Sequence, residues 1–422
     1  MIEGRILVSI TRSGKRFRAA TVNGRPAAPS ADLFASLGSQ RRRILTFGRY
    51  SQVAALAAFD AARRAEMEIC DEERREADGG FTERAIMAEA LLENLMLLTF
   101  KAGDTAKAAV RSEAAQICRQ LRSDSGVLYE AVFAFRPEDG VFARAEIAQA
   151  DRFIEGALRL CGPLLYDLVF EMTPEAFLDD LTTPGDLDSW ANAVTQPAAG
   201  ILMSRLLDEA ELFGRIDSAL LPETDGDDGF RFADEILHRL IFEPGFDAAP
   251  VWLNEPRLTG AVVRHRRHPL IRAMFARSGV TAALLWAARL LDTASLFCFL
   301  SGRAVKHAVP PASVFSYAPG TVRGGAAAFA ETAGGLLTEA FGYRSDDPEE
   351  RLFAAVRPAD WLYAPEGPAA QTVFALMRGL SRSDRSFSNE AVADAVRLAL
   401  FPLEAGVPID IQVRSGSVEP DD

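Results

Sequence analysis

The sequence predicts an α+β fold that is predominantly α-helical, with small β elements in the N- and C-terminal regions. Ala- and Leu-rich stretches in the middle of the chain repeat their apolar residues every three or four positions, which is the period of a helix. Segments near the two ends alternate apolar and polar residues, which is the period of a strand. Since 49% of its 422 residues are apolar, the chain can bury a large core.

The first part of the chain, residues 1–24, predicts a β-hairpin. The stretches RILVSITR and FRAATVN alternate apolar and polar residues between Arg5 and Asn23, and SGKR forms the bend that joins them. A loop rich in Pro and Gly follows.

The middle of the chain, residues 50–310, predicts a helical core. The capping-box pattern at Thr82 opens one long helix that we expect to run from Phe81 to Leu121. The stretch LDDLTTPGDLDSW, residues 178–190, has the composition of a loop. Further helices are predicted at Tyr50–Arg64, at Arg144–Cys161, from Gln196 onward and at Ala282–Leu300.

The last part, residues 311–413, predicts a mixture of strands and helices. Residues 313–337 are Gly-rich with a short period, and Asn389–Leu400 is a final helix. The extended segment Leu400–Val413 closes the predicted domain. Because small β elements from the two ends commonly pack together, we expect the termini to meet. Residues 1–413 then form a single domain, and 414–422 a disordered tail.

Charge and hydropathy argue against nucleic acid and membrane as partners. The formal net charge is −13, whereas phosphate binding needs a positive field. The clusters at Arg41–Arg43 and Arg264–Pro269 are short, and we interpret them as solvated faces or helix-end charges. The start of the chain lacks the apolar core of a signal peptide. Since Arg289 and Asp292 interrupt the most apolar stretch, we expect a buried helix there and a cytoplasmic protein without membrane insertion.

The cysteines and histidines form no strong metal pattern. The four cysteines stand apart, and no Cys-x-x-Cys spacing occurs anywhere in the sequence. Such cysteines in a cytosolic chain are typically buried and reduced. His265 and His268 are a weak zinc candidate, because their basic neighbourhood repels a cation.

Four segments, in order, resemble the large subunit of nickel–iron hydrogenases. The first is LTFGRYSQVAALAAFDAAR, where the family has a Cys-Gly-x-Cys element before an Ala-rich helix and a His shortly after. This chain keeps the glycine but has Phe47 and Tyr50 at the two cysteine positions and Ala54 at the histidine position.

The second and third segments lie in the second half of the chain. NEPRLTGAVVRHRRHPL, residues 254–270, is similar to the family's Glu-Thr-Gly-x-x-Ala-Arg stretch. The third runs from ETAGGLLTEAFG to VRPADWLYAPEGP, where Pro358, Trp361 and Gly367 fit the family pattern. The family has an arginine above the metal within this segment, and this chain has Gly334 at that position.

The fourth segment is the end of the predicted domain. The family ends in a helix, an Asp-Pro-Cys-x-x-Cys element and a short strand. This chain keeps Pro402 and has Leu403 and Gly406 at the cysteine positions.

The resemblance implies a hydrogenase-like chamber, here called the vestigial pocket, whose ligand positions are Phe47, Tyr50, Leu403 and Gly406, with Gly334 beside them. Nickel and iron need soft thiolate ligands, which these side chains cannot supply. We therefore expect no catalysis and no cofactor, and a pocket filled by apolar side chains.

The chain looks most like the HupK-type hydrogenase expression/formation proteins. This resemblance implies a scaffold or assembly chaperone that binds hydrogenase maturation factors or hydrogenase subunits. Two alternatives stay open. One is a metal-free structural subunit of an electron-transfer complex with iron–sulfur or quinone partners. The other is an unrelated helical enzyme, for which the sequence offers no phosphate loop, nucleophile elbow or metal triad.

Overall fold

The computed structural model describes most of the chain. The described residues are 6–13, 16–24, 52–67, 79–101, 108–135, 143–194, 198–223, 227–307, 314–319, 321–343, 351–403 and 409–415.

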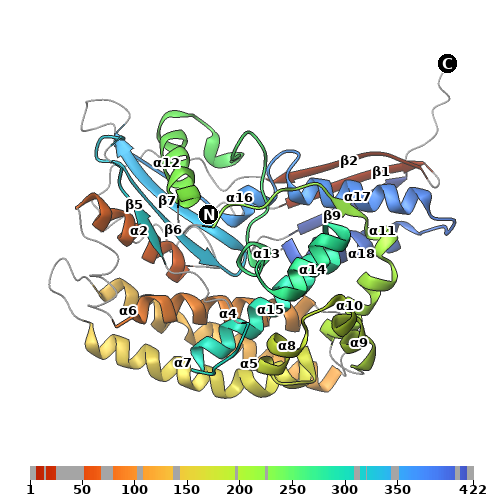
Figure 1. Cartoon of the computed structure of the whole chain (residues 1–422), viewed down its shortest axis with the longest axis horizontal. Helices are drawn as coiled ribbons and strands as arrows, with labels where there is room; N and C mark the ends of the chain where they lie inside the picture. The colour runs from red at the N-terminus through yellow and green to blue at the C-terminus, as the bar shows by residue number, and fades with distance from the viewer. Residues whose placement is uncertain are drawn as a thin grey trace.

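One apolar helix, α15 (Ala282–Leu300), runs through the middle of the molecule (Figure 1). Its N-cap is Thr281, whose hydroxyl accepts a hydrogen bond from the Leu284 amide at 3.2 Å. Every residue from Ala282 to Cys298 is buried. In the described part of the chain this is the one helix long and apolar enough to cross a membrane, and 89% of the tested window is buried inside the protein. The apolar surface of α15 is therefore buried in the core of the protein.

Helices α4 (Phe81–Lys101), α5 (Ala108–Asp124), α6 (Gly126–Ala134) and α7 (Arg144–Leu164) form a layer along one side of α15 (Figure 1). The prediction of one long helix from Phe81 to Leu121 is wrong, because α4 and α5 are separate helices that pack against each other. A continuous helix cannot bring its two halves side by side.

The predicted loop at residues 178–190 is also wrong. It contains the end of α8 (Pro174–Asp180) and most of α9 (Pro184–Ala193). Each helix begins at a Thr-Pro pair, since Thr173 and Thr183 cap the free amides while proline occupies the first turn. At Thr183 the capping box is complete, with Asp186 bonding back to the Thr183 amide at 2.8 Å.

The Gly-rich part of the chain folds into an antiparallel sheet of order β5-β6-β7-β8. Its strands are β5 (Phe315–Tyr317), β6 (Ala326–Thr332), β7 (Gly335–Tyr343) and β8 (Arg351–Val356). Helix α2 (Gln52–Glu66) packs on one face and α12 (Asp227–Phe242) on the other (Figure 1). The alanines of β6 meet the alanines of α2, so small side chains let this helix lie close to the sheet.

The two ends of the chain meet in a second sheet, of order β2-β1-β9, as predicted. The hairpin of β1 (Ile6–Ser13) and β2 (Arg16–Gly24) is joined by β9 (Ile409–Ser415), which runs parallel to β1. Helices α17 (Pro368–Arg382) and α18 (Asn389–Leu400) pack against β2 and β9, respectively. Strand β9 continues two residues beyond the predicted boundary at 413, and residues 416–422 lie outside the described residues.

The remaining elements are short. They are the π-helix η2 (Leu165–Phe170), α10 (Ala198–Asp208), α11 (Ala210–Phe213), β3 (Arg215–Ile216), η3 (Phe246–Ala248), α13 (Ala261–Arg264), α14 (Pro269–Ser278), β4 (Val280–Thr281), α16 (Pro358–Leu362) and the 3-10 turn η5 (Phe401–Leu403).

Strand β7 buries a carboxyl group, Glu339, between the sheet and α2. Its neighbours on the same face, Leu337 and Phe341, belong to the apolar cluster around α2. Burial raises the pKa of Glu339 well above its ordinary value, and the charge of Arg357 only partly opposes this. The folded state therefore binds the proton more tightly than the unfolded state, so this group's contribution to stability falls as pH rises from its unfolded pKa through its folded pKa.

We expect Glu339→Gln to become more stable relative to the parent protein as pH rises from about 4.5 to 8.5, because the amide stays neutral. The relative gain should be about 1.4 kcal/mol for each unit by which the folded pKa is raised within that range. Urea unfolding at both pH values measures it. Glu130→Gln, at an exposed position of α6, is the matched control and should give nearly the same difference at both pH values. A pH-independent difference for Glu339→Gln would contradict the assignment.

Candidate functional site

The second and third segments of the hydrogenase-like pattern pack directly on each other. The Thr259 hydroxyl accepts a hydrogen bond from the Leu336 amide at 2.8 Å. Gly260 has a φ of +90°, and a Cβ there would stand 3.1 Å from the Gly334 carbonyl oxygen. One turn further, Arg264 Nη1 donates to Glu331 Oε2 at 2.6 Å. Two segments about 70 residues apart therefore form one junction.

The predicted site residue Gly334 lies at this junction, in the two-residue turn between β6 and β7. The next residue, Gly335, has a φ of +134°, and a Cβ there would stand 2.7 Å from the Thr259 hydroxyl. Only glycine fits this backbone and this contact. Thr332 closes the turn by donating its hydroxyl to the Gly335 carbonyl at 2.8 Å.

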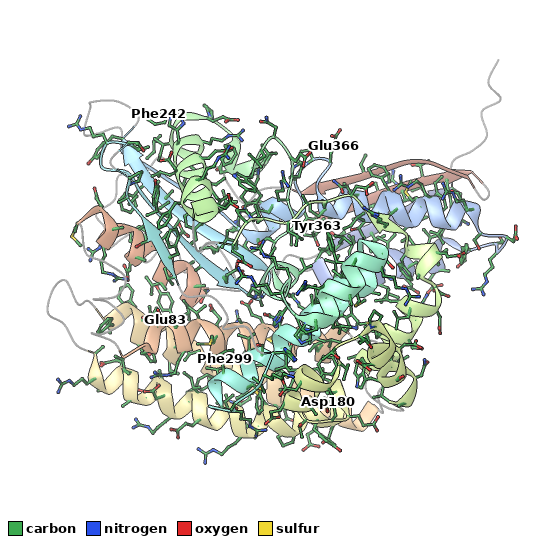
Figure 2. The ribbon with its side chains drawn as sticks, viewed as in Figure 1. Glu83, Asp180, Phe242, Phe299, Tyr363 and Glu366 are labelled. Carbon is green, nitrogen blue, oxygen red and sulfur yellow. The ribbon has the colours of Figure 1, made fainter. Side chains whose placement is uncertain are left out.

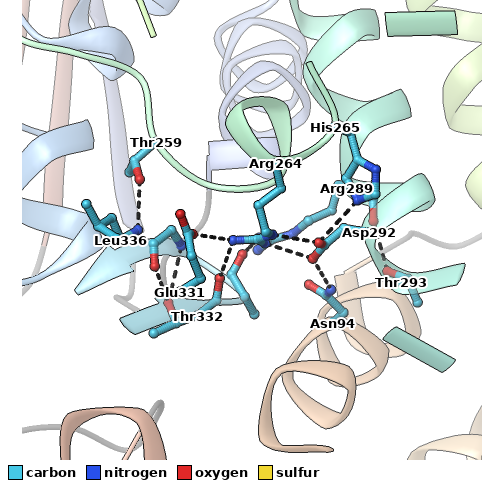
Figure 3. A network of polar contacts seen from close by, with 12 residues as sticks. Asn94, Thr259, Arg264, His265, Arg289, Asp292, Thr293, Glu331, Thr332 and Leu336 are labelled. Atoms are coloured by element: carbon cyan, nitrogen blue, oxygen red, sulfur yellow. Dashed lines mark hydrogen bonds and ion pairs between the residues drawn. The ribbon is translucent and has the colours of Figure 1, made fainter. Parts of the chain in front are cut away.

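A buried ion pair ties the junction to the central helix (Figure 3). Arg264 Nε and Nη2 donate to the two Asp292 oxygens at 2.8 and 2.9 Å. Asn94 from α4 donates to the same carboxylate at 3.2 Å, and His265 Nε2 lies 3.4 Å from it. Arg264 also donates to the Thr332 carbonyl at 3.0 Å. The guanidinium thus connects α13, α15 and the sheet.

Charge pairing offsets the cost of burying these groups. Burial acts to raise the pKa of Asp292, but the charge of Arg264 and hydrogen bonds from His265 and Arg264 hold it below its ordinary value. Burial acts to lower the pKa of Arg264, and the charges of Asp292 and Glu331 together outweigh it. Burial raises the pKa of Glu331, although Arg264 opposes the shift. Arg264 and Asp292 are therefore an ionised pair inside the protein.

A second buried guanidinium, Arg289, lies beside the turn that holds Gly334. Its Nη1 donates to the carbonyl of Ala333, the residue before Gly334. Burial lowers the pKa of Arg289 to about 10, against the charge of Asp292. The resemblance implies that the family's arginine is replaced by Gly334. In this structure α15 supplies another guanidinium, that of Arg289, to the same turn.

The fourth segment reaches the same region through Tyr363, which lies near the middle of the molecule (Figure 2). The Tyr363 hydroxyl donates to the Leu403 carbonyl at 3.5 Å, and burial raises its pKa. The Phe401 ring packs on Trp286 of α15, with 4.8 Å between ring centroids. Leu403 itself is buried, and the turn η5 that contains it packs on α15.

Two of the five predicted site residues can therefore be placed. Arg289 donates to the residue before Gly334, and Tyr363 donates to Leu403. Phe47, Tyr50 and Gly406 lie outside the described residues. Whether the five line one pocket stays a prediction.

The described part of the first segment joins the site through α4. The amides of Val53 and Ala54, at the start of α2, donate to the Glu89 carboxyl at 3.0 and 3.2 Å. Burial and the nearby Glu93 raise the pKa of Glu89 to about 8. Glu89 stands on the same helix as Asn94, so α4 connects the start of α2 to Asp292.

The residues at the site do not fit a nickel–iron group. Leu403 offers no thiolate, and its carbonyl is engaged by Tyr363. Burial raises the pKa of the Cys161 and Cys298 thiols to about 12, so both stay protonated. Cys298 is nine residues beyond Arg289, or about 13 Å along the helix.

The zinc candidate does not form a metal site either. His268 donates from Nε2 to the Leu178 carbonyl at 3.0 Å, and its Nδ1 accepts from the Leu270 amide at 3.2 Å. Both ring nitrogens are thus engaged, and burial lowers the pKa to about 4. Among the residues that the structure describes, no group of three or more His, Cys, Asp or Glu side chains is arranged to hold a metal ion.

The interpretation of Arg264–Pro269 as a solvated face is wrong for three of its residues. Arg264, His265 and His268 are buried, while Arg267 is largely exposed and pairs with Glu223. Another part of the sequence did indicate that charged residues are buried. Arg289 and Asp292 share one face of an otherwise apolar helix, and such charges must find buried partners.

A small cavity lies beside the ion pair. Its polar wall is Arg264, Glu331 and Thr332. The apolar wall consists of Ile86, Met87, Ala90 and Leu296. Its volume of about 10 Å³ is room for about one water molecule.

The backbone is similar to that of hydrogenases. The crystal structure of an NAD+-reducing nickel–iron hydrogenase in the H2-reduced state matches with a TM-score of 0.50 and 13% identity, over 93% of each chain. The fold is that of a hydrogenase large subunit. The reduced nickel–iron–selenium hydrogenase of Desulfomicrobium baculatum matches with a TM-score of 0.40 and 12% identity, over 94% of this chain and 96% of that one.

The match to the NAD+-reducing hydrogenase confirms the predicted fold class and concerns the fold alone. No protein-family model and no curated protein matches the sequence. The match to the NAD+-reducing hydrogenase covers 93% of this chain.

The buried pair gives a direct test of the site. We expect Arg264→Met and Asp292→Leu each to cost about 3–5 kcal/mol, because each leaves a buried charge without its main partner. The double variant should cost much less than the sum. Urea unfolding of the four proteins gives the coupling free energy.

The exposed pair Arg397 and Asp394 on α18 is the matched control. Its double-mutant cycle should give a coupling of about 0–1 kcal/mol. A coupling for Arg264 and Asp292 as small as that of the control would mean that the buried network does not hold the junction together.

Proposed function

We propose that this protein is a non-catalytic, hydrogenase-like accessory protein that serves as a scaffold or assembly chaperone in the maturation of nickel–iron hydrogenase. It is a pseudoenzyme in this proposal, similar to the HupK-type proteins. It works in the cytoplasm and binds hydrogenase maturation factors or hydrogenase subunits.

One observation carries the proposal. The chain has a large-subunit fold over 93% of its length, yet the positions that would carry the thiolates are Phe47, Tyr50, Leu403 and Gly406. A fold that is kept without its metal ligands has lost the groups for the chemistry, which leaves protein binding as the role that we propose. Fold alone does not establish the function, so the role rests on this combination.

The buried ion network supports a metal-free role. Arg264, Arg289, Asp292 and Glu331 meet where the second and third segments join the central helix. Their charges pair with one another or with backbone carbonyls. The junction therefore has internal partners that need no metal ion.

Affinity purification from the natural host tests the proposal. We expect the tagged chain to retain hydrogenase maturation proteins or an immature hydrogenase subunit, without stoichiometric nickel or iron of its own. Deletion of its gene should lower hydrogenase activity, and the wild-type chain should restore it. A tagged, unrelated cytoplasmic protein is the control for non-specific retention.

Three results would contradict the proposal. Stoichiometric nickel or iron in the purified chain would show a metal site. Hydrogen uptake by the chain alone would show catalysis. An iron–sulfur subunit retained at equal stoichiometry, with hydrogenase activity unaffected by the deletion, would indicate a structural subunit of an electron-transfer complex.

A further inference from the structure

One stretch of the chain carries negative charge only. Between Arg159 and Arg205 there is no Lys, Arg or His, and the stretch contains seven Asp and Glu residues. The preceding helix, α7, alternates exposed Arg and Glu residues, such as Arg152 and Glu155. The sequence therefore becomes single-signed where α7 continues into η2, and the cation of Arg303 reaches this region from another segment.

Within this stretch η2, α8 and α9 are joined by aromatic contacts, and α8 packs on α15. The Phe177 ring of α8 packs on Phe170 and on Trp190, with 4.4 and 5.0 Å between centroids. Trp190 of α9 donates its indole N–H to the Phe170 carbonyl at 2.8 Å. These contacts hold the backbones of η2, α8 and α9 in place relative to one another.

Three of the seven carboxylates have structural roles. Glu175 pairs with Arg303, and Asp186 completes the capping box at Thr183. Asp179 accepts the amides of Lys306 and His307 at 2.9 and 3.1 Å.

The other four carboxylates are at exposed positions, and Asp188 among them accepts a hydrogen bond from Asn192. Asp180 lies at the lower edge of the molecule (Figure 2). The exposed four are Asp167, Glu171, Asp180 and Asp188.

Two large apolar side chains stand beside these charges. Leu160 and Tyr166 are each 46% exposed, on the continuous helical run of α7 and η2. The Glu171 amide donates to the Tyr166 carbonyl at 2.7 Å, so this acidic residue is one turn away from the tyrosine. We call these exposed residues at the end of α7, in and just after η2, in α8 and in α9, which are Leu160, Tyr166 and the four exposed carboxylates, the acidic shoulder.

We propose that the acidic shoulder is the docking surface for a basic protein partner, with Tyr166 and Leu160 as the apolar centre of the contact. The inference rests on the proposed scaffold function and names the face that carries it. Tyrosine is enriched at the energetic centre of interfaces, and complementary charge around it speeds association. Lys and Arg side chains on the partner would meet exposed carboxylates such as Asp167 and Asp180.

Site-specific photocrosslinking in the natural host tests this surface. Tyr166 is replaced by the photoreactive p-benzoylphenylalanine, and the matched control carries it at Phe242, which is 39% exposed on α12. We expect a discrete crosslink from position 166 to a Lys/Arg-rich surface of one protein, and none from position 242. The crosslinked protein is then identified by mass spectrometry and purified.

Charge reversal completes the test with the purified partner. Asp167→Lys/Glu171→Lys/Asp180→Lys should weaken binding at least about tenfold and reduce its salt dependence. The control Glu130→Lys/Glu146→Lys/Glu155→Lys makes the same charge change on α6 and α7 and should bind nearly as the parent does. Thermal unfolding of both triple variants verifies that they fold.

Several outcomes would contradict the proposal that the acidic shoulder is a docking surface. They are no discrete crosslink from position 166, a crosslink to a second copy of this chain, a crosslinked surface that is not basic, or equal loss of binding in the two triple variants. If maturation proteins still copurify in that case, the scaffold function survives and only this face is wrong.

Discussion

Burying the Asp292 carboxylate in the middle of the most apolar helix is the constraint on which the rest of the site depends. Burying an unpaired carboxylate in this environment would cost a large part of the net stability of a folded protein. The carboxylate must therefore be paired. Arg264 satisfies this need with two hydrogen bonds and at the same time reaches Glu331 in the sheet. One guanidinium therefore fixes the distance between helix and sheet.

Several features of the fold follow from that pairing. Arg264 can reach Asp292 only if α13 lies against α15, and this requires Gly260 and Gly335 to approach each other's backbones closely. The β6–β7 turn is then held beside α15, where Arg289 donates to Ala333. Through Tyr363 the end of the chain is attached at the same place. The described parts of the regions that resemble a hydrogenase are thus joined by hydrogen bonds and charge.

The sequence predicted the elements with a strong local period, such as α15 and α18, and the meeting of the two termini. It did not separate α4 from α5, because both halves share one helical pattern and only their packing distinguishes two helices from one. The Thr-Pro caps of α8 and α9 are local indications of a helix start. The loop-like composition of residues 178–190 outweighed them in the prediction. At the site, Gly334 and Leu403 were named from the resemblance. The partners of Arg264, Arg289 and Asp292 come from segments up to about 200 residues apart, and no local pattern encodes such pairs.

The central claim is that internal charge pairing, and not a bound metal, holds the junction together. Calorimetric unfolding of protein produced in medium depleted of nickel and iron, compared with protein from medium supplemented with both, tests it most directly. The account predicts one cooperative transition at the same temperature in both preparations, unaffected by a chelator. A transition several degrees higher in the supplemented preparation, accompanied by stoichiometric metal and reversed by the chelator, would contradict it.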